Sequence, residues 1–198
     1  MERCIKIANR HNLKNNFVIG YVGTHGMAHG LSNVLEVAEK LKHRKNICFL
    51  FVGAGADREN LIKLSSSRNL SNTIFLPMQP KEEMPSIWSL CDVALVHLKD
   101  NPAFSEVIPS KIFEAMSMGL PILLNIPSGE ARDIIENEHA GIWVPPEDPE
   151  ALAKSIKTLI DDKNLRNQIS RNCVAAAPKY SRNQQARKMI EVFEKAIS

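Results

Sequence analysis

The chain has 198 residues, of which 44% are hydrophobic and 24% are charged, and its formal net charge at pH 7 is +3. This length allows one domain with a substantial core, whereas two full domains would be cramped. The composition is that of a globular protein and argues against long disorder. Because Lys and Arg are interleaved with Asp and Glu, the sequence gives no case for a nucleic-acid surface.

The four cysteines lie far apart and form no C-x-x-C pair, so they indicate neither a zinc site nor a disulfide framework. Reduced thiols fit a cytosolic protein. No apolar run approaches the roughly 18 to 20 residues of a membrane span, and the N-terminus lacks the apolar core of a signal peptide. We therefore expect a cytoplasmic location.

Residues 1–16 are polar and basic and carry no strand pattern, so we interpret them as the remnant of an interdomain linker. From residue 17 onward, short apolar runs recur that are rich in β-branched and aromatic residues. Most lack polar alternation, which is typical of strands buried on both faces. The runs cover residues 17–23, 47–53, 73–77, 92–98, 121–125 and 141–145.

Helical patterns separate most of these runs, and the clearest covers residues 31–41, where apolar residues recur at spacings of three and four. Alternating β and α elements imply a parallel sheet with right-handed crossovers and helices on both sides. The predicted fold class is therefore α/β, a single doubly wound Rossmann-like domain over residues 17–198 with a parallel sheet of about six strands.

Beyond Pro146 the chain is predicted to be wholly helical, so residues 146–198 form a helical tail. Asp148 is the expected N-cap of its first helix, with Pro149 at the first helical position. The last helix, from about Arg182, carries an apolar stripe that needs a partner surface. The stripe consists of Ala186, Met189, Ile190, Phe193 and Ile197.

In open α/β sheets, ligands bind beyond the carboxyl ends of the strands, so the loops there are searched first. The stretch GTHGMAHG runs from Gly23 to Gly30, and its glycines allow a phosphate to approach the backbone and the free amides of the following helix start. A flexible strand-to-helix turn would explain the same glycines. The loop has neither the GK[ST] ending of a P-loop nor the G-x-G-x-x-G pattern.

Two further loops carry weaker signals. Gly53 and Gly55 follow the second strand and could leave room for a flat ring, although a tight turn explains them equally well. Met78 lies in LPMQPKEEM, a loop punctuated by prolines whose backbone groups could face the edge of a base.

The stretch AFSEVIPSKIFEAMSMGLPILL gives the strongest signal. Ser110 is the expected N-cap of a helix that runs from Lys111 to about Met118. The unpaired amides near Lys111 and Ile112, together with the Lys111 charge, would suit a diphosphate.

Two acids flank this helix start. Pro109 prevents Glu106 and Glu114 from sharing one helix, so they belong to different elements. Glu114 could reach a diol, and Glu106 a second hydroxylated group on the other side. Taken singly, each has a simpler explanation that we would favour: Glu114 complements the helix dipole, and Glu106 is a solvated loop charge.

Together these residues resemble the C-terminal nucleotide-sugar-binding domain of family 4 retaining glycosyltransferases, which have the GT-B fold. The E-x7-E pattern from Glu106 to Glu114, followed by AMSMGLPILL, is similar to the acidic motif of that family and to its EAM-x-x-G-x-P segment. The stretches VGAGADRENL, IFLPMQPKEEMPSIWSLCDVALV and GIWVPPEDPEALAKSI fall in the family's order, and the resemblance covers residues 17–198. NPAFSEVIPSKIFE resembles the signature of a subgroup typified by L-fucosamine transferases of bacterial surface polysaccharide synthesis.

The resemblance implies a role for each matching residue. It assigns Glu114 to the ribose hydroxyls and Glu106 to the donor sugar, and it places Ser110, Lys111 and the loop Gly23–Gly26 at the diphosphate. Glu106 and Lys111 would be the catalytic residues, because they face the sugar and the leaving group.

The match has departures at the first loop. Many family members carry an Arg shortly after the first strand and a Lys before the glycine that opens the first helix, whereas Thr24 and His29 stand at roughly those positions here. We expect Lys111, assisted by His25 or His29, to supply the missing positive charge. A neutral imidazole would donate one hydrogen bond, and protonation would add charge as the pH falls toward about 6.5.

A GT-B enzyme has two such domains, and its N-terminal domain holds most of the acceptor. The resemblance therefore implies the donor-binding half of a retaining glycosyltransferase, either excised or one subunit of a split enzyme, and barely active alone. Its donor would be a nucleoside diphosphate sugar, with UDP favoured, and its acceptor a glycan or a lipid-linked glycan. Helix amides and Lys111 can stabilise the leaving diphosphate, and no DxD-type acidic pair is found, so neither a metal nor another cofactor is expected.

Contact with the inner face of a membrane would belong mostly to the N-terminal half. Two alternatives stay open: half of a nucleotide-sugar 2-epimerase, which shares the two-domain fold, and a non-catalytic nucleotide-binding module.

Overall fold

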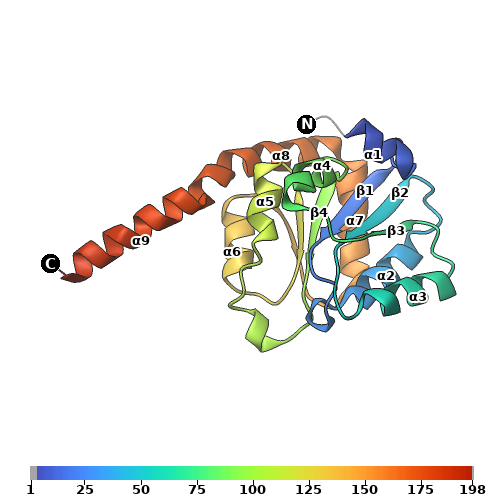
Figure 1. Cartoon of the computed structure of the whole chain (residues 1–198), viewed down its shortest axis with the longest axis horizontal. Helices are drawn as coiled ribbons and strands as arrows, with labels where there is room; N and C mark the ends of the chain where they lie inside the picture. Colours follow the sequence, from blue (N-terminus) through green and yellow to red (C-terminus); the bar gives the residue numbers. More distant parts are fainter. Residues whose placement is uncertain (1–3, 198) are drawn as a thin grey trace.

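The computed structural model of the chain describes residues 4–197 and contains one sheet of six parallel strands, in the order β3-β2-β1-β4-β5-β6 (Figure 1). This order is that of a doubly wound sheet, so the predicted fold class is confirmed. The strands are β1 (Phe17–Val22), β2 (Ile47–Val52), β3 (Thr73–Leu76), β4 (Val93–His97), β5 (Ile122–Asn125) and β6 (Gly141–Val144).

All six predicted strands are present, each within one residue of its predicted start and shorter by one or two residues. The four central strands are buried almost throughout, which is why they lack polar alternation. Parallel strands need long crossovers, and helices supply most of them. These helices are α2 (Leu31–Lys40), α3 (Arg58–Ser67), α4 (Met84–Trp88), α5 (Lys111–Ser117) and α6 (Glu130–Asn137).

The helices form a layer on each side of the sheet (Figure 1). On one side α2 packs against both α3 and α7 (Pro149–Asp161), and α7 also contacts β5 and β6. On the other side α5 packs against β4, β5 and α8 (Lys163–Ala176). The predicted N-cap of α7 is confirmed, because the Asp148 side chain accepts a hydrogen bond of 2.9 Å from the amide of Ala151.

The segment before β1 contains α1 (Ile5–Arg10) and packs against the domain. Ala8 and Leu13 are buried in the core, so this part of the predicted linker contributes to the domain itself. Residues 1–3 of that prediction, and residue 198 of the predicted helical tail, lie outside the described residues.

The last helix, α9 (Arg182–Ile197), begins at the predicted residue and projects away from the sheet (Figure 1). It contacts the 3-10 turn η4 (Ala177–Tyr180) at its base. The predicted stripe is exposed, with Met189, Ile190 and Phe193 all more than half accessible.

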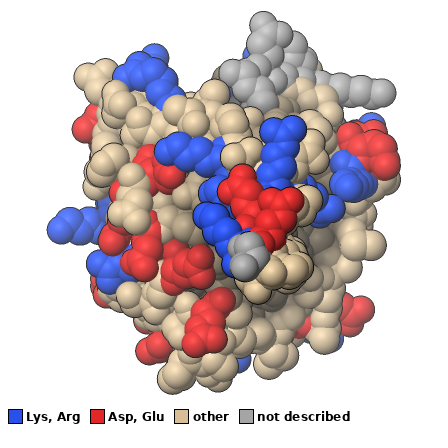
Figure 2. All heavy atoms as spheres, turned by 90° about the vertical axis from the view of Figure 1, so that its left-hand side faces the viewer, with Lys and Arg blue, Asp and Glu red and all other residues tan. Residues whose placement is uncertain are grey.

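Figure 2 views the molecule from the side to which α9 projects, and it shows acidic and basic side chains intermingled over this face. Within residues 4–197, no helix combines the length and the apolar character that crossing a bilayer requires.

Candidate functional site

The strand order reverses between β1 and β4, so the loops that follow these two strands separate there and leave a crevice. A reciprocal pair of contacts ties the two loops together. His97 Nδ1 donates to the carbonyl oxygen of His29 over 2.6 Å, and His29 Nδ1 lies 3.4 Å from the carbonyl oxygen of His97. The amide of Lys99 also donates to the carbonyl oxygen of Ala28 over 3.0 Å. The floor of the crevice is therefore fixed from both sides.

A cleft of about 510 Å³ opens above this crevice. Six of the predicted site residues line it: Gly23, Thr24, His29, Ser110, Lys111 and Glu114. The remaining lining comes from the end of β1, the loop after β3, the start of α4 and the loop after β4. These residues are Val22, Gln79, Lys81, Met84, Leu98, Val107 and Pro109. The structure thus brings together the loops after β1, β3 and β4 and the starts of α4 and α5, which lie far apart in the sequence.

Lys111 is one of the residues that line the cleft. Its Nζ is 4.0 Å from the centroid of the Tyr21 ring, and a Cβ atom at Gly23 would lie 2.8 Å from Nζ. Burial lowers the pKa of Lys111 to about 8, while the nearby Glu114 carboxylate acts in the opposite direction. At pH 7 the ammonium group is therefore charged and only partly hydrated, which makes it a strong partner for an anion.

The start of α5 differs in one detail from the prediction. Ser110 is the N-cap residue, but its side chain forms no capping hydrogen bond, and the amide of Ile112 donates to the carbonyl oxygen of Pro109 over 3.0 Å. The backbone bends into a turn one residue earlier than expected, so the Ile112 amide is occupied. Among the described residues, the amides of Ser110 and Lys111 have no hydrogen-bond acceptor, and these two are available to a ligand.

Glu114 lies one turn into α5 and is exposed. Its Oε2 accepts a hydrogen bond of 3.2 Å from Nε1 of the buried Trp88, on α4. This contact fixes one carboxylate oxygen and leaves the other for a ligand.

Glu106 is exposed on the loop ahead of α5 and does not line the cleft, whereas its neighbour Val107 does. Gly129 packs closely against the backbone of this loop, since a Cβ atom at Gly129 would collide with the carbonyl oxygen of Ser105. Glu106 is therefore next in the chain to a residue that lines the cleft.

The expectation that His25 supplies positive charge is wrong. Its side chain is fully buried among aromatic rings, with centroids 5.8 Å from Tyr21 and 6.3 Å from Phe51, and it does not line the cleft. Burial, with the positive charges of Arg58 and Lys111, lowers its pKa to about 4, so the ring is neutral at pH 7.

His29 does line the cleft, but its pKa is lowered as well, first by burial and then by the charge of Lys111. Because the normal imidazole pKa is about 6.5, His29 is neutral at pH 7 and can offer hydrogen bonding rather than charge.

Gly53 and Gly55 do not make room for a ring. A Cβ atom at Gly53 would collide with the carbonyl oxygen of Gly23, and one at Gly55 would collide with the backbone of His25. The amide of His25 donates to the carbonyl oxygen of Ala54 over 2.8 Å. The two glycines are explained by the close packing of the first loop on the second, and neither lines the cleft.

Two other predicted residues lie outside the lining. Met78 is 73% exposed, and the next residue, Gln79, lines the cleft instead. Gly26 is the residue before the 3-10 turn η1 (Met27–His29), and it does not line the cleft.

Sequence reasoning missed Tyr21, Trp88, Lys81 and Met84. Tyr21 and Trp88 lie within apolar patterns that predict core residues, and their polar atoms reveal a role only once their partners are known. Lys81 and Met84 stand in the motif that carries the family resemblance, which was the available signal.

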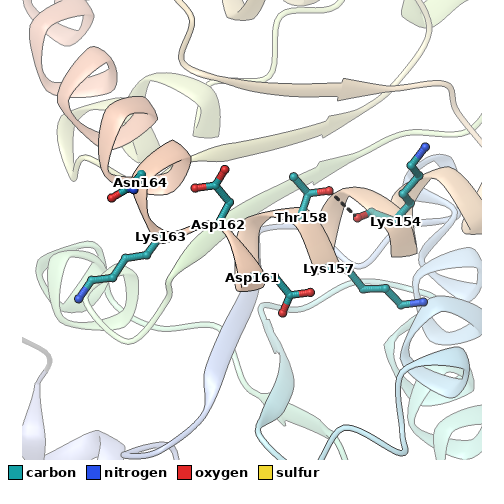
Figure 3. A pocket seen from close by; sticks show the side chains of 7 residues that line it. All are labelled: Lys154, Lys157, Thr158, Asp161, Asp162, Lys163 and Asn164. Atoms are coloured by element: carbon teal, nitrogen blue, oxygen red, sulfur yellow. Dashed lines mark hydrogen bonds between the residues drawn. The ribbon is translucent and has the colours of Figure 1, made fainter.

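A larger but shallow hollow of about 700 Å³ lies at the corner between α7 and α8 (Figure 3). Lysines and aspartates line it, but their side chains point in different directions rather than toward a common centre. Because α7 runs back along the sheet from β6, this corner lies at the edge opposite to the cleft. Among the described side chains, no group of three or more His, Cys, Asp or Glu residues is placed to hold a metal ion.

The family described as "Glycosyl transferases group 1" matches residues 5–174. The chain therefore belongs to the group 1 glycosyl transferases. One curated relative is the alpha-D-kanosaminyltransferase of Streptomyces kanamyceticus, which is 29% identical over 182 residues. That alignment covers 90% of this chain but 46% of the relative, so the chain spans less than half of the length of this curated relative.

Solved structures share the fold at low identity. The HepE protein of Anabaena, in complex with UDP, superposes with a TM-score of 0.81 at 21% identity, covering 94% of this chain and 52% of that one. The C-terminal domain of LpcC, a glycosyl transferase group 1 family protein from Francisella tularensis, superposes with a TM-score of 0.74 at 21% identity. This superposition covers 92% of the present chain and 95% of the LpcC domain. The chain therefore has the Rossmann-like α/β fold, with a six-stranded parallel sheet, that these solved structures share.

Proposed function

We propose that the chain is the donor-binding half of a retaining glycosyltransferase and that its cleft binds a nucleoside diphosphate sugar. The observation that carries the proposal is the partly buried Lys111 ammonium, which lies in the cleft without an ion-pair partner among the described residues. A buried charge of this kind is costly unless an opposite charge approaches it, and a diphosphate supplies that charge.

The parts of the donor follow from the order of groups along the cleft. The diphosphate lies against Lys111 and the amides of Ser110 and Lys111, which can donate to its oxygens. Glu114 accepts from the ribose diol with the oxygen that Trp88 leaves free. Glu106 reaches the sugar from the loop ahead of α5.

The relatives support this proposal through their names. The kanosaminyltransferase is named for the transfer of an aminosugar, and HepE is described in complex with UDP. A UDP-linked donor is therefore our first choice. Membership of the L-fucosamine subgroup is the finer part of the proposal, and it rests on the resemblance of NPAFSEVIPSKIFE.

In the complete enzyme, the donor half orients the nucleotide sugar and stabilises the charge that builds on the leaving diphosphate. Lys111 and the two free amides provide this stabilisation from the protein itself, so we propose a reaction that needs no divalent metal. A second domain, at the cytoplasmic face of a membrane where the acceptor is lipid-linked, would hold the acceptor and complete the cleft.

Calorimetric titration of the chain with UDP, GDP and their sugars tests the proposal. We expect binding of a nucleoside diphosphate that changes with the attached sugar, because the cleft continues past the diphosphate toward Glu106. Binding that ignores the sugar would favour a regulatory module, and absence of any nucleotide binding would overturn the proposal.

Two lysine variants test whether the nucleotide binds in the cleft or elsewhere on the surface. Lys111→Met should weaken binding, whereas Lys157→Met should leave it unchanged. Lys157 is a matched control because it is exposed and lies at the opposite edge of the sheet.

A further inference from the structure

Tyr21 lies in an apolar strand pattern that predicts a core residue, but in the fold it contacts two elements of the cleft. It stands near the end of β1 with only 1% of its surface exposed, directly beneath the cleft. Burial raises the pKa of its phenol, so the hydroxyl stays protonated and acts as a hydrogen-bond donor. The hydroxyl of a buried tyrosine usually has a hydrogen-bond partner, and the identity of that partner shows which segment the side chain fixes.

The hydroxyl of Tyr21 donates to the carbonyl oxygen of Thr24 over 2.8 Å. This bond spans three residues and closes the turn that carries Gly23. Gly23 and Thr24 both line the cleft. The phenol therefore fixes the backbone of the first loop where it meets a ligand.

The ring of Tyr21 holds a second element of the cleft. Lys111 Nζ lies 4.0 Å from the ring centroid, within the range of a cation–π interaction. Gly23 bounds the ammonium group on another side, where a Cβ atom would come within 2.8 Å of Nζ. No salt bridge of Lys111 occurs in the described part of the chain, and the nearby Glu114 carboxylate acts on the ammonium only over a longer distance, so the ring is the side chain in direct contact with it.

We propose that Tyr21 is a positioning residue of the donor site, which holds the Lys111 ammonium with its ring and the Gly23–Thr24 turn with its hydroxyl. Two separate diphosphate-binding groups, from different elements, are thereby fixed by one side chain. The inference rests on the proposed function. Tyr21 acts through Lys111 and through the turn, and it does not itself contact the donor.

Three variants test the two contacts, with UDP affinity measured by calorimetry on the full chain. Tyr21→Phe keeps the ring and removes the bond to Thr24, so we expect UDP binding to weaken about 3- to 10-fold. Tyr21→Leu removes both contacts, and we expect a loss of roughly 10- to 100-fold. Phe51→Leu is the matched control, because it removes a buried ring that packs 6.4 Å from Tyr21 without contact to Lys111. It should change UDP affinity less than about 2-fold.

A double-mutant cycle decides whether Tyr21 acts through Lys111. In the Lys111→Met background, Tyr21→Leu should weaken UDP binding by no more than Tyr21→Phe does in the original chain, because no ammonium remains to be positioned. Equal losses in both backgrounds would overturn the inference, as would a loss in Phe51→Leu as large as in Tyr21→Leu.

A spectroscopic measurement covers the case in which Tyr21→Leu does not fold. The ε-methylene protons of Lys111 should resonate upfield of those of other lysines, because they are next to the ammonium nitrogen that lies over the Tyr21 ring. The shift should persist in Tyr21→Phe. Its absence in the original chain would overturn the inference, whereas a chain that shows the shift but binds no nucleotide would overturn the proposed function.

Discussion

Replacing Lys111 with methionine is expected to weaken UDP binding strongly at pH 7 and hardly at all at high pH. The ammonium group is charged at pH 7, because its pKa is about 8 in the free protein. A hydrogen bond to a charged group contributes about 1.5 to 3 kcal/mol, so its loss should raise the Kd for UDP roughly 10- to 150-fold. The methionine side chain has a similar length and keeps the packing over the Tyr21 ring.

The pH dependence follows from the direction of the pKa shift. Above pH 8, Lys111 is increasingly neutral in the free protein, so UDP binding must be accompanied by proton uptake, and its affinity should fall by up to about tenfold per pH unit. Below about pH 6, the terminal phosphate of UDP becomes protonated and the affinity falls again. The affinity of the original chain should therefore be highest between these two values.

Calorimetry across this pH range, in buffers with different ionisation enthalpies, measures both the affinity and the proton uptake. Lys111→Met should lose the decline above pH 8 and the proton uptake, while Lys157→Met should keep both. Unchanged affinity of Lys111→Met at pH 7, or an identical alkaline decline in the variant and the original chain, would refute the assignment of Lys111 to the diphosphate.

Three other changes test separate parts of the structure. Gly53→Ala places a methyl group against the Gly23 carbonyl at a φ of +152°, so it should lower the unfolding free energy by about 2 to 3 kcal/mol in denaturant titration. Gly26→Ala, at a φ of −104° and with no neighbour within 3.4 Å of the added Cβ atom, should leave the unfolding free energy nearly unchanged. An equal loss of unfolding free energy in both variants would contradict the packing argument. Trp88→Phe removes the donor to Glu114 and should weaken UDP binding about 3- to 10-fold, while pyrophosphate, which has no ribose, should bind as before. A chelator should leave UDP binding unchanged, and a loss that divalent ions restore would refute metal independence.

The sheet could be predicted from the sequence because each strand is a local signal. Six apolar runs with β-branched residues and little polar alternation fix the strands, and the Asp148–Pro149 pair fixes the start of α7. These patterns depend on neighbours in the chain, so they can be read without the structure.

The cleft was predicted in part, because its charged groups stand in motifs while their surroundings depend on distant residues. Lys111 and Glu114 were found, but nothing local shows that the space beside Gly53 is filled by the Gly23 carbonyl. Nor does the sequence show that His25 turns into the core. Small residues in a loop suggest free space beside its backbone, but whether another loop fills that space depends on tertiary packing.

The paired contacts between His29 and His97 give the cleft a property that matters for its use. Because both loops at the strand reversal are already fastened to each other, a nucleotide need not order them, and little binding energy is spent on conformational entropy. Such a preorganised surface suits crystal soaking with fragments as small as uridine or pyrophosphate, because each fragment can bind its part of the site without a rearrangement of the loops.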